Sequence, residues 1–189
     1  MKNLKTIAIA LLVTFGTATV SAQAKKVDAA KSTISWVGKK VTGQHSGTVA
    51  LKEGTLIFKD KKLAGGSFTV DMTAISVSDL KAGEGKEKLE GHLKADDFFG
   101  SEKFPTATLV FKSLGAKANN TYSVTADLTI KGITKPVTFD IVVNGNKATT
   151  AFKVNRTVYG IQYGSGSFFE NLGDKTINDD FELSVNLVF

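Results

Sequence analysis

Two histidines and a pair of adjacent aspartates are the residues of this 189-residue chain best suited to chemistry. His45 and His92 could bind one metal ion together with Asp96, although nothing in their spacing requires it and such histidines more often make structural hydrogen bonds. Asp96 and Asp97 could serve as general acid and base, because close carboxylates shift each other's pKa values. Neighbours in sequence point in different directions, however, and an aspartate before a turn is commonly a cap or turn residue. We therefore expect neither a metal site nor a catalytic site.

Motifs for nucleophilic catalysis and phosphate binding do not occur in the sequence either. The chain contains no cysteine, which also excludes disulfides, and no Gly-x-Ser-x-Gly elbow. The run Gly164–Ser165–Gly166 lacks the strand–turn–helix setting of such an elbow and the lysine of a phosphate loop. We predict a protein that is not an enzyme and that needs no cofactor.

The first 22 residues are typical of a secretory signal peptide. Two lysines precede an apolar run, residues 7–20, that is too short for a stable membrane span. Small residues permit cleavage after Ala22 or Ala24. We interpret residues 1–22 as the signal peptide and residues 23–189 as one exported domain. The mature protein is expected in the periplasm and not as an integral membrane protein.

The positive charge of the chain comes almost entirely from lysine. The formal net charge is +6, the lysines are scattered, and Arg156 is the only arginine. Scattered ammonium groups are typical of a solvated surface, whereas recognition of nucleic acid relies on clustered charge and on arginine forks. We therefore expect no nucleic-acid partner.

Alternating apolar and polar residues recur along the mature chain and predict half-buried strands. In the clearest case every second residue from Tyr122 to Ile130 is apolar, and the residues between them are polar. The same period occurs in residues 67–72, 107–111, 137–143 and 181–189, and in shorter form in residues 34–37, 48–51, 55–59 and 149–154. Eight or nine strands result, each with one polar face.

Short, turn-like links join these predicted strands, and two longer connections interrupt them. The turn-like links are residues 53–54, 65–66, 118–120, 131–132 and 144–146. Consecutive hairpins make an antiparallel meander, which could fold into a sandwich but which we expect to close into a barrel, because closure removes exposed edges. The longer connections are residues 76–105, with a helix-like piece from Lys86 to Lys94, and residues 155–180. Long connections in a small domain are often lids or binding loops.

Four stretches of the sequence resemble a known family. They are "STISWVGKKVTGQHSGTV", "LEGHLKADDFFGSEKFPTATLVFKS", "ADLTIKGITKPVTFDIVV" and "NRTVYGI". With them the chain resembles the YceI family of exported, lipocalin-like polyisoprenoid-binding proteins, from about Lys31 to the C-terminus. The two central motifs are long and specific, whereas the first stretch is looser, with Trp36 where many members carry phenylalanine.

This resemblance implies an all-β fold: an eight-stranded antiparallel, lipocalin-like barrel with a short helical insertion. It implies no enzyme activity, and an apolar pocket that takes isoprenoid chains, quinone tails or fatty amides. Positions expected to face inward, together with one arginine at the mouth, then become the predicted ligand contacts. They are Trp36, Phe68, Val70, Met72, Phe98, Phe99, Leu109, Phe111, Val124, Ala126, Leu128, Phe139, Ile141, Phe152 and Arg156.

The stretch from Asp96 to Pro105 is expected to link a lid to the barrel wall. Phe98 and Phe99 would turn inward and cover one end of the barrel, while Asp96 and Asp97 cap the preceding helix turn and face water or a lysine. Pro105, with its fixed φ and no N–H group, would start the next strand at a permitted position.

Two further residues carry specific hypotheses. Arg156 would lie at the barrel mouth, where its planar fork could bind a phosphate or carbonyl head group or form a structural salt bridge. Ala126 is small among larger inward neighbours, and we expect its size to keep the tunnel open.

The function predicted from these observations is a periplasmic carrier or store for a long-chain isoprenoid or related lipid. An eight-stranded barrel can instead be filled by its own side chains, so a structural or envelope-stress module without a ligand is one rival. An enzyme that acts on a lipid head group through the histidines and aspartates is a second rival. The sequence leaves a homodimer open.

Overall fold

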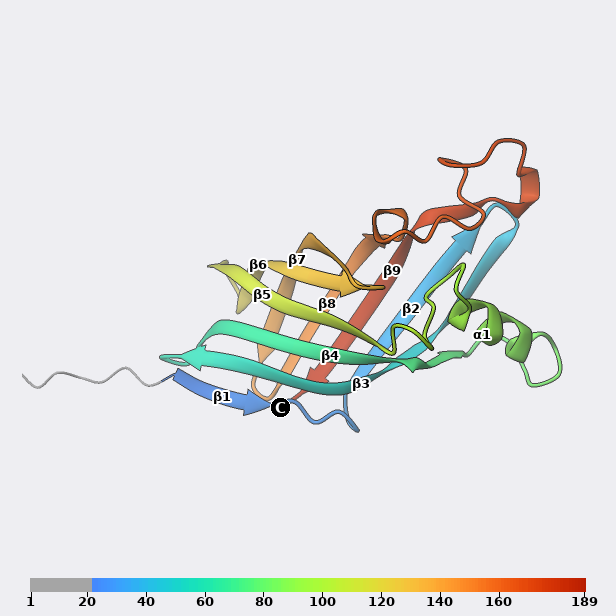
Figure 1. Cartoon of the computed structure of the whole chain (residues 1–189). Coiled ribbons are helices and arrows are strands. Elements are labelled where there is room, and N and C mark those ends of the chain that lie inside the picture. The colour runs from blue at the N-terminus through green and yellow to red at the C-terminus, as the bar shows by residue number, and fades with distance from the viewer. Residues whose placement is uncertain (1–21) are drawn as a thin grey trace, which may run out of the picture.

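Alternating strands joined by short turns form one antiparallel sheet that closes on itself. The structure is a computed structural model, and it describes residues 22–189. The strands in this range are β1 Ala22–Lys26, β2 Thr33–Lys40, β3 Gly43–Lys59, β4 Lys62–Val77, β5 Thr106–Ala116, β6 Thr121–Ile130, β7 Ile133–Asn144, β8 Lys147–Asn155 and β9 Ile177–Val188. Strands β2 to β9 make the ring, because each pairs with the next and β9 pairs with β2 (Figure 1). The predicted eight-stranded antiparallel barrel is confirmed.

Strand β1 lies outside this ring and was not predicted. It pairs with the second half of β3, from Ala22 opposite Lys59 to Lys26 opposite Thr55, whereas β2 pairs with the first half. Its sequence, Ala-Gln-Ala-Lys-Lys, has no apolar alternation that could indicate a strand. Apart from Ala22, the predicted signal peptide lies outside the described residues.

Tight turns with left-handed backbone join several consecutive strands. The predicted links at residues 118–120, 131–132 and 144–146 join β5 to β6, β6 to β7 and β7 to β8. The turn between β3 and β4 lies at Asp60 and Lys61, whose φ angles are 51° and 64°. Successive positive φ values fit the twist of a two-residue hairpin.

The other two predicted turns, at residues 53–54 and 65–66, are wrong, because these residues lie inside β3 and β4. Their glycines mark close packing instead of chain reversal. A Cβ atom on Gly54 would lie 2.7 Å from Cδ1 of Phe68, and one on Gly66 would lie 2.9 Å from Cε2 of Phe111. Glycine therefore gives two aromatic rings room against the barrel wall.

Replacing Gly66 by alanine is expected to destabilise the barrel. The new methyl group would press on the ring of Phe111, which is itself packed against the ring of Phe68. Overpacking of this kind costs about 1–2 kcal/mol, and urea unfolding would measure it. Gly115→Ala is the matched control, since nothing lies within 4 Å of the added atom. Equal effects of the two substitutions would contradict the packing argument.

Both long connections lie at the same end of the barrel, opposite the β3–β4 turn (Figure 1). The first connection, residues 78–105, contains the helix α1, Lys86–Lys94, whose bounds match the predicted helical piece. Pro105 lies one residue before β5, and its carbonyl accepts a hydrogen bond from the Met72 N–H. The second connection, residues 156–176, contains two short 3₁₀ helices, η1 Thr157–Tyr159 and η2 Gly173–Lys175.

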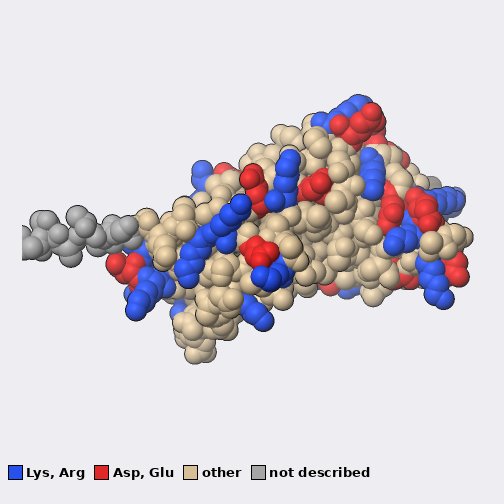
Figure 2. Space-filling model, turned by 90° about the horizontal axis from the view of Figure 1, so that it is seen from below, with Lys and Arg blue, Asp and Glu red and all other residues tan. Residues whose placement is uncertain are grey.

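The surface charges are mixed. Figure 2 shows lysines interspersed with acidic side chains over the visible face. Several lysines of the described chain form exposed ion pairs, for example Lys117 with Asp140 and Lys112 with Asp127. This pattern fits the solvated surface expected from the scattered lysines.

Candidate functional site

Two apolar cavities adjoin inside the barrel. The outer cavity, about 130 Å³, lies beneath the two connections, and the inner cavity, about 90 Å³, lies deeper between the strands. Both are bounded by Ile34, Val70, Ala107, Leu128 and Leu183. Only apolar surface is exposed inside either cavity. Such a space is poorly suited to water and well suited to hydrocarbon.

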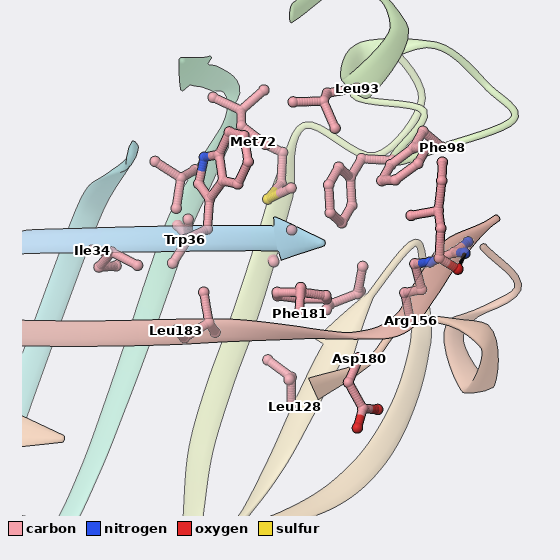
Figure 3. A pocket seen from close by; sticks show the side chains of 18 of the residues that line it. Ile34, Trp36, Met72, Leu93, Phe98, Leu128, Arg156, Asp180, Phe181 and Leu183 are labelled. Carbon is pink, nitrogen blue, oxygen red and sulfur yellow. Dashed lines mark hydrogen bonds between the residues drawn. The ribbon is translucent and has the colours of Figure 1, made fainter. Parts of the chain in front are cut away.

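Elements far apart in the sequence enclose the outer cavity. Figure 3 shows Trp36 from β2, Phe181 from β9 and Phe98 from the first connection around this space. The indole N–H of Trp36 donates a hydrogen bond to the Thr48 carbonyl at 3.3 Å, which fixes the ring on the cavity wall. The second connection contributes Arg156, and β9 begins with Ile177 at the same rim.

Most residues predicted to contact a ligand line one or both cavities. Those at the outer cavity are Trp36, Val70, Met72, Phe98, Phe99, Leu128 and Arg156. Those at the inner cavity are Phe68, Val70, Leu109, Phe111, Leu128, Phe139, Ile141 and Phe152. The remaining two, Val124 and Ala126, line neither cavity and are fully buried.

A layer of aromatic rings explains why Ala126 lies away from the cavities. Phe111 pairs with Ala126 across β5 and β6, and its ring packs on Phe68 and Phe139 at centroid distances of 5.6 and 6.1 Å. Phe139 also stacks on Phe152 at 4.5 Å. The small side chain of Ala126 thus faces a packed ring and not an open tunnel.

Several residues that line the cavities were not predicted from the sequence. Phe181, Leu183, Val185 and Leu187 of β9 line the cavities and belong to the alternating C-terminal run, which predicted the strand but was not extended to the site. Leu93 of α1 is a further one. The same inward-face argument would have found the four β9 residues.

Phe98 and Phe99 turn inward, as the lid interpretation expected. Both are buried, and their rings meet edge to face at a centroid distance of 5.2 Å. The chain reverses after α1 through Gly100, whose φ is 57° and whose N–H donates to the Ala95 carbonyl. Lys131 of the β6–β7 turn holds the segment down by donating to the Phe98 carbonyl at 2.9 Å. The rings therefore close the outer cavity from the side of the first connection.

The two aspartates before these rings do not cap the helix, so that part of the prediction is wrong. Ala95 is the C-terminal cap of α1, and carboxylates are unfavourable at the negative end of a helix dipole. Asp96 pairs instead with Lys103, in agreement with the expected lysine partner. Asp97 pairs with the ring of His92 at 3.3 Å.

The two histidines are held by different carboxylates. Nδ1 of His45 lies 2.9 Å from Asp79, whereas Nε2 of His92 lies 3.3 Å from Asp97. In the part of the chain that the structure describes, no three His, Cys, Asp or Glu side chains form a group that could hold a metal ion. Each histidine thus has a local structural partner.

Arg156 is buried at the rim of the outer cavity and is bound to the protein itself. Its guanidinium donates to the carbonyls of Ile161, Tyr163, Ile177 and Asn178 at 2.8–3.0 Å. Burial lowers the pKa of this guanidinium, and the charge of Asp179, 3.6 Å away, opposes that shift. The expected fork for a lipid head group is therefore engaged by backbone, and the structural alternative describes this residue better.

Comparison with known proteins gives the identity of the fold. A family model described as the YceI-like domain matches residues 26–189. The chain belongs to the YceI family. The match begins at the last residue of β1 and includes all eight strands of the ring.

Sequence similarity to two curated relatives covers less than half of this chain. A UPF0312 protein of Shewanella denitrificans is 36% identical over 86 residues, which cover 46% of this chain and 42% of the relative. A UPF0312 protein of Staphylococcus aureus is 38% identical over 88 residues, which cover 41% and 48%. This chain therefore spans less than half the length of these relatives.

Solved structures share the fold at low sequence identity. BcnA of Burkholderia cenocepacia has a TM-score of 0.65 and 24% identity, covering 86% of this chain and 99% of its own. A polyisoprenoid binding domain from Saccharophagus degradans has a TM-score of 0.61 and 12% identity, covering 89% and 97%. Within residues 22–189 of this YceI protein, no helix is long and apolar enough to cross a bilayer.

In this YceI barrel, Glu90 fastens α1 to the strand beneath it. Its Oε1 accepts hydrogen bonds from the Val77 N–H at 2.8 Å and from the Ser76 hydroxyl at 2.9 Å. These bonds, the backbone bond foremost, hold the pKa of Glu90 below its ordinary value of 4.5. The position of α1, and of Phe98 and Phe99 after it, thus depends on an ionised carboxylate.

Acidification is expected to remove the contribution of Glu90 to stability. Because its pKa is lower in the folded than in the unfolded protein, the contribution is complete above the ordinary value of 4.5 and is lost as the pH falls through the folded pKa. Urea unfolding should show that Glu90→Gln is less stable than the wild type at neutral pH, and the difference should shrink under strongly acidic conditions. A difference that does not change with pH would contradict this account.

Proposed function

We propose that this chain is an exported, periplasmic binding or carrier protein for a long-chain isoprenoid or related amphiphilic lipid. The observation that carries the proposal is the pair of adjoining apolar cavities, of which the outer one is bounded on one side by Phe98 and Phe99. The fold shared with a polyisoprenoid binding domain supports the class of ligand. The predicted signal peptide, residues 1–22, supports the periplasmic location.

Burial of hydrocarbon supplies the affinity in this proposal. A chain of ten methylene-sized units gains about 8 kcal/mol when it leaves water, before the costs of binding. Each cavity alone is smaller than the apolar cavity of about 150 Å³ that takes benzene. A long chain therefore has to occupy both cavities, and the aromatic rings that line them have to rotate to enlarge the space. The five residues shared by both walls mark its path.

Polar groups of the ligand would lie at the rim. Asn178 and Asp180 border the outer cavity and are exposed to solvent. Arg156 lies beside them, but its N–H groups are bound to backbone carbonyls. We assign the recognition of the chain to the apolar walls and give Arg156 the role of holding the rim in shape.

Two alternatives fit the structure less well. A barrel completely filled by side chains would lack interior cavities of this size. An enzyme acting through the histidines would need them to converge, whereas each is paired with a different aspartate. A binding role requires neither catalytic group nor cofactor.

Trp36 offers a direct test, because it is the only tryptophan of the chain and borders the outer cavity. A long-chain fatty amide brominated along its chain should quench Trp36 fluorescence in delipidated, refolded protein, with saturation near one ligand per chain. A four-carbon brominated amide is the control and should not quench at the same concentration. Absence of saturable quenching by the long chain would contradict the proposal and favour a filled core.

A further inference from the structure

Exposed aromatic side chains gather on one loop of the second connection. This loop, residues 160–172 between η1 and η2, is here called the mouth loop. Phe168 and Phe169 are each 50% exposed and Tyr163 is 46% exposed, although phenylalanine is usually buried. In the described part of the chain these are the only aromatic residues among the strongly exposed large apolar side chains.

Hydrogen bonds hold the mouth loop in this conformation. The N–H groups of Phe168 and Phe169 donate to the carbonyl of the buried Ser165 at 3.1 and 3.0 Å. The Ser167 hydroxyl donates to Asp179 at 2.6 Å. Arg156 binds the Tyr163 carbonyl at the base of the loop. The exposure of the phenylalanines therefore belongs to an ordered loop and not to a frayed one.

The mouth loop lies at the end of the barrel where the outer cavity lies. The Tyr163 ring meets His92 edge to face at 4.4 Å, and His92 packs on the lid residue Phe98. Val41, 64% exposed, lies beside the end of the second connection, since its N–H donates a hydrogen bond to the Thr176 carbonyl. Figure 1 shows the second connection projecting at the same end as α1. Exposed apolar groups thus lie at the end of the barrel where the outer cavity lies.

We propose that the mouth loop, with Val41, docks on the surface of a lipid bilayer and places the outer cavity against it. The inference rests on the proposed function, since a protein that carries membrane lipid has to collect it from a membrane. Aromatic side chains on a projecting loop suit the membrane interface, where rings insert among head groups. The mouth loop carries a single charged residue, Glu170, so its contact with the bilayer depends on its apolar side chains and not on charge.

Flotation with vesicles of phosphatidylethanolamine and phosphatidylglycerol tests this proposal. The wild-type domain should float with the vesicles, and the double variant Phe168→Ser, Phe169→Ser should lose about tenfold in bound fraction because its apolar anchor is gone. The matched control is Val110→Ser, which removes a side chain of similar exposure, 45%, from the barrel wall. Equal flotation of wild type and double variant, or no flotation of the wild type, would overturn the proposal.

Two further readouts separate this proposal from the lipid-binding function. Thermal melts and Trp36 quenching by the brominated amide, measured without vesicles, should be the same in the double variant and the wild type. Flotation without saturable quenching would show that docking survives while the lipid-binding function fails. Self-association of the wild type that the double variant loses, with no flotation, would assign the loop to a contact with a second copy and overturn membrane docking.

Discussion

Replacing Ala107 by phenylalanine is expected to reduce the lipid bound to the purified protein about tenfold without a large loss of stability. Ala107 lies on β5 and borders both cavities, so a larger side chain there extends into their shared part. The ring would occupy space that the proposed lipid chain needs and would touch apolar walls. Filling of an existing cavity avoids the strain of an overpacked core, so the free energy of unfolding should change by less than about 1.5 kcal/mol. Lipid extraction and urea unfolding of the variant measure both effects.

Ala126→Phe is the matched control for this variant. Ala126 also faces inward, but it is fully buried opposite the packed ring of Phe111 and borders neither cavity. The same added volume should therefore cost about 1–3 kcal/mol in overpacking and leave the lipid content of the folded fraction unchanged. If Ala107→Phe keeps its lipid and loses stability like Ala126→Phe, the cavities are not the binding site.

Replacing Arg156 by methionine is expected to lower the free energy of unfolding by about 3–5 kcal/mol, as when one member of a buried charged pair is removed. Arg156 is only 2% exposed, and its removal leaves four backbone carbonyls without their donor and the Asp179 carboxylate without its neighbouring positive charge. Each unsatisfied buried group adds to the loss. Urea unfolding at neutral pH measures the change. Arg156→Lys should recover only part of it, because an ammonium group cannot reproduce the planar fork.

Lys39→Met is the control, because it removes a positive charge that is exposed on the surface and not buried. Lys39 pairs with Glu182 on the surface, where both side chains are about 40% exposed, so its loss should cost less than about 1 kcal/mol. If Arg156→Lys retains full stability but loses bound lipid, a head-group role for Arg156 would replace the structural one.

The period-two pattern was sufficient to predict most of the barrel. It identified the strand from Tyr122 to Ile130, and the spacing of leucines in residues 86–94 identified the one α-helix of the described chain. Glycine was harder to interpret, since Gly54 and Gly66 look like turn residues in sequence. Their role depends on rings from other parts of the chain, Phe68 and Phe111, which local sequence does not specify.

From the sequence, the inward face of each strand could be predicted, but not which residues on that face line a cavity. Alternation shows that Val124, Ala126 and Leu128 point inward, but only Leu128 reaches a cavity. Whether an inward residue meets empty space or a packed ring depends on side chains from the opposite wall. The partners of Arg156 come from two segments, near residues 161 and 177, that only the folded second connection brings together.

Mass spectrometry of an organic extract of the purified wild-type protein tests the central claim most directly. The protein should be expressed with its signal sequence in a host that makes isoprenoid lipids, and purified without detergent. We predict a long-chain isoprenoid or related lipid at close to one molecule per chain. A parallel extract of Ala107→Phe should contain about tenfold less, because the added ring occupies the space that both cavities share. An extract of the wild type without any stoichiometric lipid, from protein that also fails to bind added long-chain isoprenoid, would contradict the account.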